Sequence, residues 1–264
     1  MVHYRTLFIS DVHLGTRNCQ AQALSDFLDM HDAETVYLVG DIVDFWRIKS
    51  GATWTEAQSA AMHRLLMKER AGARIIFIPG NHDDGLRVYC GMKFGNIEIK
   101  KNAIFETSSG RRYVVMHGDE FDVVVNNARW LAFLGDRGYQ LALLANIPIN
   151  FVRRRFGLGY WSLSAYLKSR VKSAVNFIGD FEDLLSSEAR RQSADGIICG
   201  HIHRAASKMI GDIHYVNTGD WVESCTAVVE NDQGELELIN WLDMQNQNKQ
   251  SGHAAVTNGL GVAV

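Results

Sequence analysis

The sequence lacks the features that identify several large classes of protein. No apolar run in its 264 residues approaches the roughly 20 that a membrane-spanning helix requires, so no membrane span is expected. The opening residues 1–6 pass directly into a strand-like run, and no signal peptide fits there. The net charge of −3 gives no overall attraction to nucleic acid, which is therefore not expected as a partner.

Cysteine is scarce, and its spacing shows no pairs. The chain has four, Cys19, Cys90, Cys199 and Cys225. We interpret them as reduced core thiols rather than as a disulfide framework, which favours a cytoplasmic location. The length suits one large domain, or one domain with a substantial insertion.

Against these absences, five short segments concentrate polar residues, and they contain five of the ten histidines. Each segment follows a short run rich in β-branched and aromatic residues, such as residues 6–10, 35–39 and 74–78. Such runs are typical of strands that are buried on both faces. The segments are Asp11-Val12-His13, Gly40-Asp41-Ile42-Val43-Asp44, Gly80-Asn81-His82-Asp83, His117-Gly118-Asp119 and Gly200-His201-Ile202-His203.

Polar residues just after strands predict a ligand site, because open α/β sheets bind ligands at the carboxyl ends of their strands. Gly40, Gly80 and Gly200 let the backbone turn sharply beside a crowded site. Aspartate, asparagine and neutral imidazole suit divalent ions such as Mn²⁺, Fe²⁺ and Zn²⁺. Two such ions can clamp a phosphoryl group and activate a water molecule, and Asp41 is the natural bridge between them.

Each segment alone has an ordinary explanation. Gly-Asp can form a turn, and Asn-His-Asp can cap a helix. All five together, each after a strand, favour a metal site instead. The remaining histidines match no segment, and we expect them to be surface or hydrogen-bonded residues: His3, His31, His63, His214 and His253.

The chain changes character between residues 121 and 191, where strand-like runs give way to helical stretches that we expect Pro148 and the glycines at 157 and 159 to interrupt. We expect a core made of residues 1–120 and 192–243, a helical insertion at 121–191 and a polar tail at 244–264. Between residues 146 and 178 there are six basic residues, no acidic residue and many aromatic ones. This pattern favours an anionic lipid surface or an acylated phosphate ligand over nucleic acid or an ordinary solvated face.

The five segments, in this order, resemble those of the calcineurin-like metallophosphoesterase superfamily. The resemblance implies an α/β sandwich of two mixed β-sheets flanked by helices, with a helical insertion. It implies two divalent metal ions, with Mn²⁺ expected and Fe²⁺ or Zn²⁺ as alternatives. Asp11, His13, Asp41 and His203 would bind one ion, and Asp41, Asn81, His117 and His201 the other. His82 and Asp41 are the candidate catalytic residues, and Asp44 and Asp83 would orient the ligands.

The insertion resembles that of the UDP-2,3-diacylglucosamine pyrophosphatases of lipid A synthesis, as do residues 40–46, 200–204 and 217–221. This implies an acyl-binding lid, peripheral contact with the inner face of the cytoplasmic membrane, and hydrolysis of a nucleotide–sugar pyrophosphate. Candidate substrate contacts are Arg153, Arg154, Arg155, Tyr160, Trp161, Lys168 and Arg204.

The chain departs from that family at His82, where its members usually carry Arg. Imidazole can donate a proton near pH 7, whereas guanidinium cannot. An alternative is therefore a phosphomonoesterase or phosphodiesterase that acts on a soluble, nucleotide-like substrate. A non-catalytic membrane-binding scaffold is disfavoured, because buried Asp and His without a metal would be costly.

Overall fold

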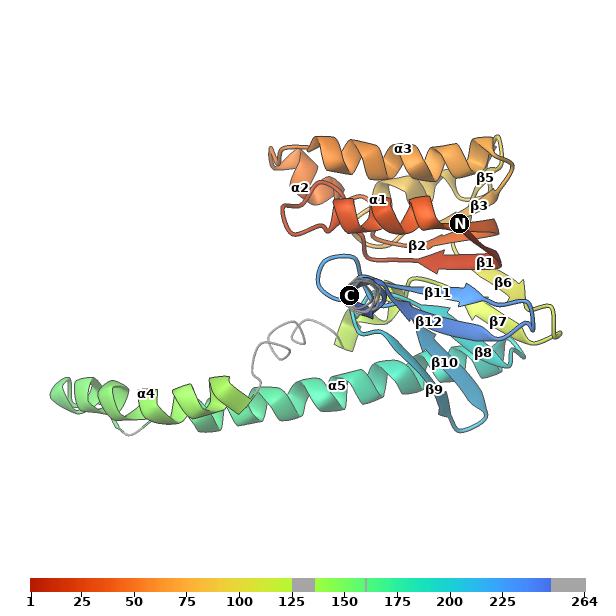
Figure 1. The fold of residues 1–264 in the computed structure, drawn as a ribbon. Coiled ribbons are helices and arrows are strands. Elements are labelled where there is room, and N and C mark those ends of the chain that lie inside the picture. The colour runs from red at the N-terminus through yellow and green to blue at the C-terminus, as the bar shows by residue number, and fades with distance from the viewer. Residues whose placement is uncertain (125–135, 160, 248–264) are drawn as a thin grey trace, which may run out of the picture. The chain divides into compact units, whose positions relative to one another are not determined.

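The computed structural model describes residues 1–124, 136–159 and 161–247 and shows two mixed β-sheets with helices around them (Figure 1). The first sheet has seven strands in the order β12-β11-β1-β2-β3-β5-β4, and the second has five in the order β6-β7-β8-β10-β9. Both sheets contain parallel and antiparallel pairs. The predicted α/β fold with two mixed sheets is therefore confirmed.

The strands of the first sheet are β1 Val2–Ile9, β2 His31–Val39, β3 Arg74–Ile78, β4 Lys93–Phe94, β5 Ile97–Ile99, β11 Thr226–Glu230 and β12 Leu236–Asn240. Those of the second are β6 Ala103–Glu106, β7 Arg112–Val115, β8 Gly196–Cys199, β9 Ala206–Ile210 and β10 Ile213–Asn217. The helices before residue 192 are α1 Ala21–Met30, α2 Phe45–Lys49, α3 Glu56–Arg70, η1 Asp84–Tyr89, η2 Asp119–Val124, α4 Asp136–Arg155 and α5 Leu163–Arg191, as far as the described residues show.

The central strands of the first sheet are buried on both faces, because a separate hydrophobic core packs against each face. Strands β1, β2 and β3 pair in parallel and in register, so that Phe8, Tyr37 and Ile76 form one row across the sheet. This row packs against residues of the second sheet. The adjacent row, which starts at Leu7, packs against α1 and α3 on the opposite face (Figure 1).

Helices α1 and α3 cover the first sheet, and their sequences explain why they form. Leu24, Phe27 and Leu28 of α1 are buried, as its apolar face predicts. Helix α3 begins with a capping box, in which the Thr55 hydroxyl accepts from the Gln58 amide and the Gln58 side chain accepts in return. The strands β4, β5, β6 and β9 were not predicted. Except for β5, they lie at sheet edges.

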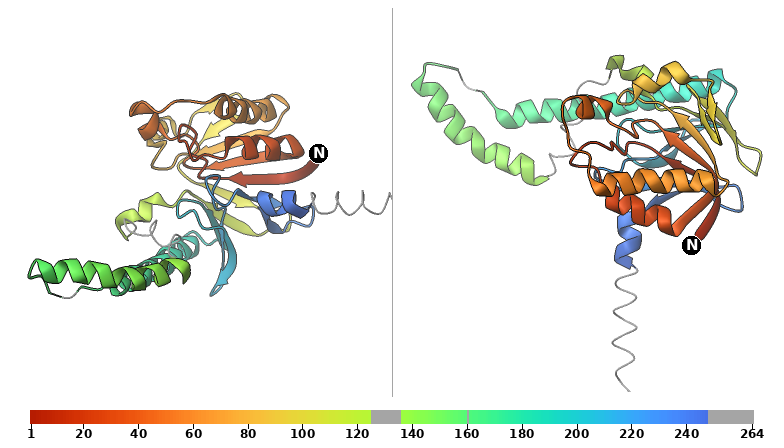
Figure 2. Two further views of the ribbon diagram at one scale, coloured as in Figure 1. Left: turned by 60° about the vertical axis from the view of Figure 1, so that its left-hand side comes forward. Right: turned by 90° about the horizontal axis from the view of Figure 1, so that it is seen from above.

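The described chain divides into two compact units. The first comprises Met1–Asp119 and Ser186–Val264, and the second comprises Glu120–Leu185. The second unit holds α4 and most of α5, which are joined by a turn (Figure 2). None of the described helices is long and apolar enough to cross a membrane.

The expectation that Pro148 interrupts the insertion is wrong, because Pro148 lies inside α4. Proline removes one backbone hydrogen bond at a cost of about 3 kcal/mol, which a 20-residue helix can absorb. Gly157 does lie beyond the end of α4, with a φ of +70°. Of the expected tail, only residues 244–247 are described, and they continue a helix that starts at Trp241.

Candidate active site

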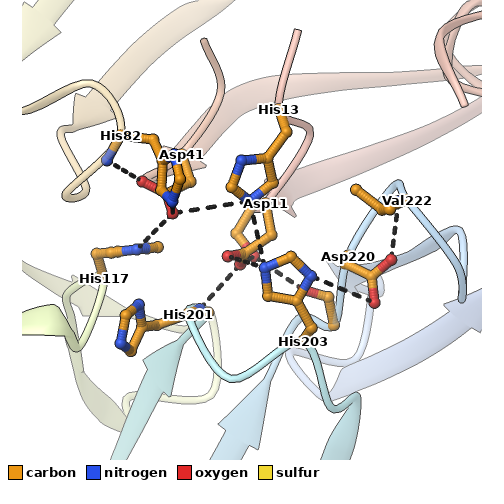
Figure 3. A network of polar contacts seen from close by, with 12 residues as sticks. Asp11, His13, Asp41, His82, His117, His201, His203, Asp220 and Val222 are labelled. Atoms are coloured by element: carbon orange, nitrogen blue, oxygen red, sulfur yellow. Dashed lines mark hydrogen bonds and ion pairs between the residues drawn. The ribbon is translucent and has the colours of Figure 1, made fainter. Parts of the chain in front are cut away.

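The five polar segments meet at the carboxyl ends of β1, β2, β3, β7 and β8 (Figure 3). Three overlapping groups of side chains could each hold a metal ion, with their ligand atoms within 4.8 Å of one another. The first is Asp11, His13 and His203, the second is His13, Asp41 and His82, and the third is Asp41, His117 and His201. Asp41 belongs to both the second and the third group.

The side chains of the cluster point at one another. His117 Nε2 lies 3.4 Å from Asp41 Oδ2, and His13 Nε2 lies 3.7 Å from the same oxygen. On the other side, His203 Nε2 lies 3.3 Å from Asp11 Oδ1 and 3.2 Å from His13 Nε2. Converging imidazole nitrogens and carboxylate oxygens are the arrangement that bound cations require.

The backbone beneath these ligands is strained. Among the described residues, seven other than glycine have a positive φ, and five of them are predicted metal ligands. Left-handed backbone costs an ordinary residue about 1–3 kcal/mol and persists only where the surroundings enforce it. The five are Asp11, His13, Asp41, His201 and His203, with φ between 50° and 72°.

Three glycines make room for the cluster. A Cβ at Gly40 would overlap the His117 ring, and one at Gly80 would overlap the Asp41 carboxylate. A Cβ at Gly200 would overlap the Asp11 carboxylate. Only Gly40 has a positive φ, so the reason for glycine at the other two positions is space rather than a sharp turn.

Asp83 ties the second polar segment to the third. Its buried carboxylate accepts hydrogen bonds from the backbone amides of Gly80, at 2.6 Å, and Ile42, at 2.8 Å. The Asp41 side chain adds a reciprocal link, because its Oδ1 accepts from the His82 amide at 2.8 Å. Asp83 Oδ1 also accepts from the Asp41 backbone amide at 3.3 Å, so Asp83 fixes the loops that carry Asp41 and Asn81.

Asp44 sits behind two imidazole rings. Its Oδ2 lies 2.9 Å from Nδ1 of His82 and 3.4 Å from Nδ1 of His13. Both rings therefore turn their Nε2 atoms toward Asp41, at 4.0 Å from His82 and 3.7 Å from His13. The half-exposed indole of Trp46 packs on the His82 ring, with 4.2 Å between ring centroids.

Several positioning residues were not among the predicted site residues. Arg87 of η1 binds Asp119 Oδ2 at 2.6 Å and the Pro79 carbonyl at 3.3 Å, so it links the third and fourth segments. Asp220 Oδ2 lies 4.0 Å from His203 Nδ1 (Figure 3). The Asn217 amide donates to the Gly200 carbonyl at 2.7 Å. The resemblance of residues 217–221 to the pyrophosphatases was the available signal for the last two, whereas no signal indicated Arg87.

The electrostatics of the cluster couple Asp41 to its imidazole neighbours. Burial opposes charge on His117, but the Asp41 carboxylate outweighs it and raises the pKa of His117 to about 10. Burial likewise opposes charge on Asp41, yet His117, His13 and His82 hold its pKa well below the usual range. His117 Nδ1 donates to the Val39 carbonyl at 2.9 Å, which leaves Nε2 facing Asp41.

The donor set fits divalent metal ions. Buried atoms of predicted ligands that form no hydrogen bond among the described residues include Asp11 Oδ1, Asn81 Oδ1 and His117 Nε2. A buried polar atom left unpaired costs about 1–3 kcal/mol, and a coordinated cation would remove that cost. The second set of predicted ligands, Asp41, Asn81, His117 and His201, thus includes two of these atoms.

The predicted substrate contacts fall in both units. Arg204 is exposed in the loop after His203. Arg153, Arg154 and Arg155 end α4 in the second unit, and Trp161 follows the turn. Tyr160 and the Lys168 side chain lie outside the described residues.

A family model for calcineurin-like phosphoesterases matches residues 4–205, which span the five polar segments. The chain belongs to this family. It is therefore a metal-dependent phosphoesterase, and the superfamily predicted from the sequence is confirmed.

Several curated relatives of the chain share one name. A protein of Cellvibrio japonicus called UDP-2,3-diacylglucosamine hydrolase is 27% identical over 251 residues, covering 89% of this chain and 98% of the relative. Proteins of the same name from Shewanella halifaxensis and Vibrio cholerae are 23% and 26% identical, covering 89% and 81% of this chain and 97% and 85% of the relatives. Among solved structures, a phosphoesterase of E. coli matches with a TM-score of 0.42 at 12% identity, over 89% of this chain and 98% of that chain.

Proposed function

We propose that the protein hydrolyses the pyrophosphate bond of a nucleotide-linked, acylated sugar such as UDP-2,3-diacylglucosamine, with two Mn²⁺ ions. The observation that carries the proposal is the arrangement of two groups of ligands on either side of Asp41, with His82 beside it. The choice of substrate draws on the relatives, whose shared name is UDP-2,3-diacylglucosamine hydrolase. A cytoplasmic location belongs to the same proposal, and all four cysteines are free thiols.

In this proposal Asp11, His13 and His203 hold one ion, Asn81, His117 and His201 hold the other, and Asp41 joins both. Two bound cations would lower the pKa of a water molecule and neutralise charge on the phosphoryl oxygens. The water oxygen forms a bond to phosphorus, and the bridging P–O bond breaks. The products are UMP and the acylated sugar monophosphate.

His82 is suited to protonate the departing oxygen. Asp44 Oδ2 lies 2.9 Å from Nδ1 of His82, and Nε2 of His82 lies 4.0 Å from Asp41 Oδ2 in the cluster. Trp46 packs against the same ring and limits its rotation. His82→Ala should lower kcat by roughly 10²–10⁴-fold while the metal content stays at the wild-type level.

A second candidate is a phosphodiesterase or phosphomonoesterase for a soluble, nucleotide-like substrate. The paired His82 and Asp44 favour it, because a proton donor helps most when the leaving group is a poor one. The pyrophosphatases that the chain resembles usually carry Arg here, which cannot fill that role.

A substrate panel distinguishes the two candidates. Protein stripped with a chelator and reloaded with Mn²⁺, Fe²⁺ or Zn²⁺ is assayed on UDP-2,3-diacylglucosamine, on its deacylated counterpart, on a nucleoside monophosphate and on a cyclic nucleotide. Release of UMP from the acylated compound, at a kcat/KM well above that of the others, supports the proposal. Turnover of soluble esters alone would replace it by the second candidate. His82→Arg should then lower activity on poor leaving groups more than on nitrophenyl esters.

A further inference from the structure

Two buried hydroxyl groups stand in a row behind the Asp11 carboxylate. Ser10 lies between the end of β1 and the first polar segment, and its hydroxyl donates to Asp11 Oδ2. Ser10 Oγ also lies 2.5 Å from Oγ1 of Thr218, which directly follows β10. All three residues are fully buried. We call the side-chain hydroxyls of Ser10 and Thr218 the hydroxyl pair.

The direction of the hydrogen bonds in the hydroxyl pair follows from the carboxylate. A carboxylate can only accept, so the single proton of the Ser10 hydroxyl is committed to Asp11. In the contact between the two hydroxyls Thr218 is therefore the donor. Each hydroxyl also has a backbone carbonyl nearby, that of Gly219 at 3.2 Å from Ser10 and that of Cys199 at 3.1 Å from Thr218. Both of these contacts are longer, so they compete weakly for the protons.

The hydroxyl pair determines which oxygen of Asp11 faces the metal cluster. Oδ2 accepts from the Ser10 hydroxyl and from the His201 amide, the latter at 2.9 Å. Oδ1 is directed toward His203, at 3.3 Å from Nε2, and forms no hydrogen bond among the described residues (Figure 3). One oxygen of the carboxylate is thus held by the protein, and the other is left for a cation.

The loop that begins at Thr218 contacts the same two ligands at further points. The Trp221 amide donates to the Asp11 carbonyl at 3.0 Å. Asp220 Oδ2 lies 4.0 Å from Nδ1 of His203, the ring nitrogen that does not face Asp11 (Figure 3). Asp11 and His203 belong to one of the groups that could hold a metal ion. Residues about 200 positions away in the chain therefore support the ligands at the end of β1.

We infer that the hydroxyl pair sets the affinity for the ion that Asp11 and His203 would hold, which we call the first ion. Ser10 and Thr218 are positioning residues, since they act through Asp11. The inference rests on the two-ion arrangement of the proposed function. Both hydroxyls are buried, so bulk water cannot replace the hydrogen bond that Asp11 loses when they are removed. Loss of such a partner behind a metal ligand weakens metal binding by about 10–100-fold.

The test is calorimetric titration of the chelator-stripped full chain with Mn²⁺. His203→Ala and His117→Ala each lack a ligand of one ion, so they identify the two binding steps. Ser10→Ala should weaken binding of the first ion by about 10–100-fold and leave the second step unchanged. Thr218→Val should weaken it less, because Ser10 can still donate to Asp11. Thr218→Ser keeps the hydroxyl and should restore wild-type binding.

A double-mutant cycle separates the action of the hydroxyl pair from a general loosening of the loop. Without the Ser10 hydroxyl, that of Thr218 no longer acts on Asp11. Ser10→Ala with Thr218→Val should therefore bind the first ion as Ser10→Ala alone does. Thr6→Val is the matched control, because the buried Thr6 hydroxyl, earlier on β1, donates to the Glu230 carboxylate at 2.8 Å. It should lower the Tm and change neither binding step.

Four results would overturn the inference. Wild-type binding of the first ion by Ser10→Ala would do so, while two ions in the wild type would leave the proposed function standing. Losses that add in the double variant would mean that the hydroxyls act independently. Equal weakening of both steps, or the same weakening in Thr6→Val, would assign the effect to the fold. Fewer than two ions in the wild type would overturn the two-ion arrangement as well. Should Ser10→Ala not fold, Thr218→Val, which keeps the shape of the side chain, and its Thr218→Ser rescue decide the question.

Discussion

A glycine pair within one stretch of chain tests the crowding of the metal cluster most directly. Gly80 and Gly85 both have φ values that alanine can adopt. At Gly85, in η1, a Cβ would meet nothing within 4 Å. At Gly80 it would overlap Asp41 Oδ1 and lie 2.7 Å from both the Asp41 nitrogen and His117 Cδ2. The same substitution should therefore disturb the cluster at Gly80 and leave it unchanged at Gly85, five residues away.

The required movement can be worked out from these distances. Ordinary contact begins at 3.4 Å, so the Asp41 nitrogen and the His117 ring must each retreat by about 0.7 Å. Metal–ligand distances tolerate only about 0.2 Å. Overpacking of this kind costs about 1–3 kcal/mol, and a misplacement approaching 1 Å can cost 10²-fold in rate. We expect Gly80→Ala to lose about 10²-fold in kcat and to bind its metals more weakly.

The assay combines elemental analysis, turnover of a nitrophenyl phosphodiester at saturating Mn²⁺, and thermal unfolding. Gly85→Ala should match the wild type in all three. Gly80→Ala should lose metal and rate together, with its Tm lowered by about 2–4 °C per kcal/mol of strain. Full activity and full metal content in Gly80→Ala would refute the reasoning, since the cluster would then have space that the structure does not show.

Three further outcomes follow from the contacts. Asp41→Asn should lose most activity and lower the metal content measured by elemental analysis, because a neutral group would face two cations. Arg87→Ala should weaken Mn²⁺ binding by about 10–100-fold in calorimetric titration, with partial rescue by Arg87→Lys, because the bond to Asp119 fixes the loops of Asn81 and His117. Burial lowers the pKa of His31, and Lys68 reinforces this against the opposing Phe27 carbonyl. The unfolded chain therefore takes up this proton first as pH falls below about 6.5, so stability in urea titrations should decline there, and less so in His31→Phe.

The strands that carry the cluster could be predicted from the sequence, because burial on both faces makes them rich in apolar residues. Residues 74–78 form β3 with the expected bounds, since strands with a core on both faces are apolar nearly throughout. Strands β1, β2 and β3 are parallel neighbours in the first sheet and β7 and β8 in the second, so the polar residues that follow the strands of each sheet had to lie at one edge of that sheet. For these segments the local apolar pattern predicts a buried strand, and the fold places a buried strand there.

Contacts between distant loops could not be predicted in this way. The pairing of Arg87 with Asp119 depends on the path of η1 after Asn81, and a short 3₁₀ helix has no apolar period to indicate it. The approach of Asp220 to His203 likewise depends on the return of β10 to lie beside β8. Nothing in the residues themselves fixes either distance.

The strained ligands show why these distant contacts matter. Asp11, His13 and Asp41 adopt left-handed backbone, which each residue alone would avoid. Backbone bonds from Asp11 to Gly40, at 3.0 Å, and from His13 to Asp41, at 2.9 Å, hold the first two segments together. Asp11 Oδ2 also accepts from the His201 amide at 2.9 Å. Because protein contacts enforce this geometry, little of a metal ion's binding free energy is lost in ordering the loops. The affinity for the metal should therefore depend on residues that do not coordinate it.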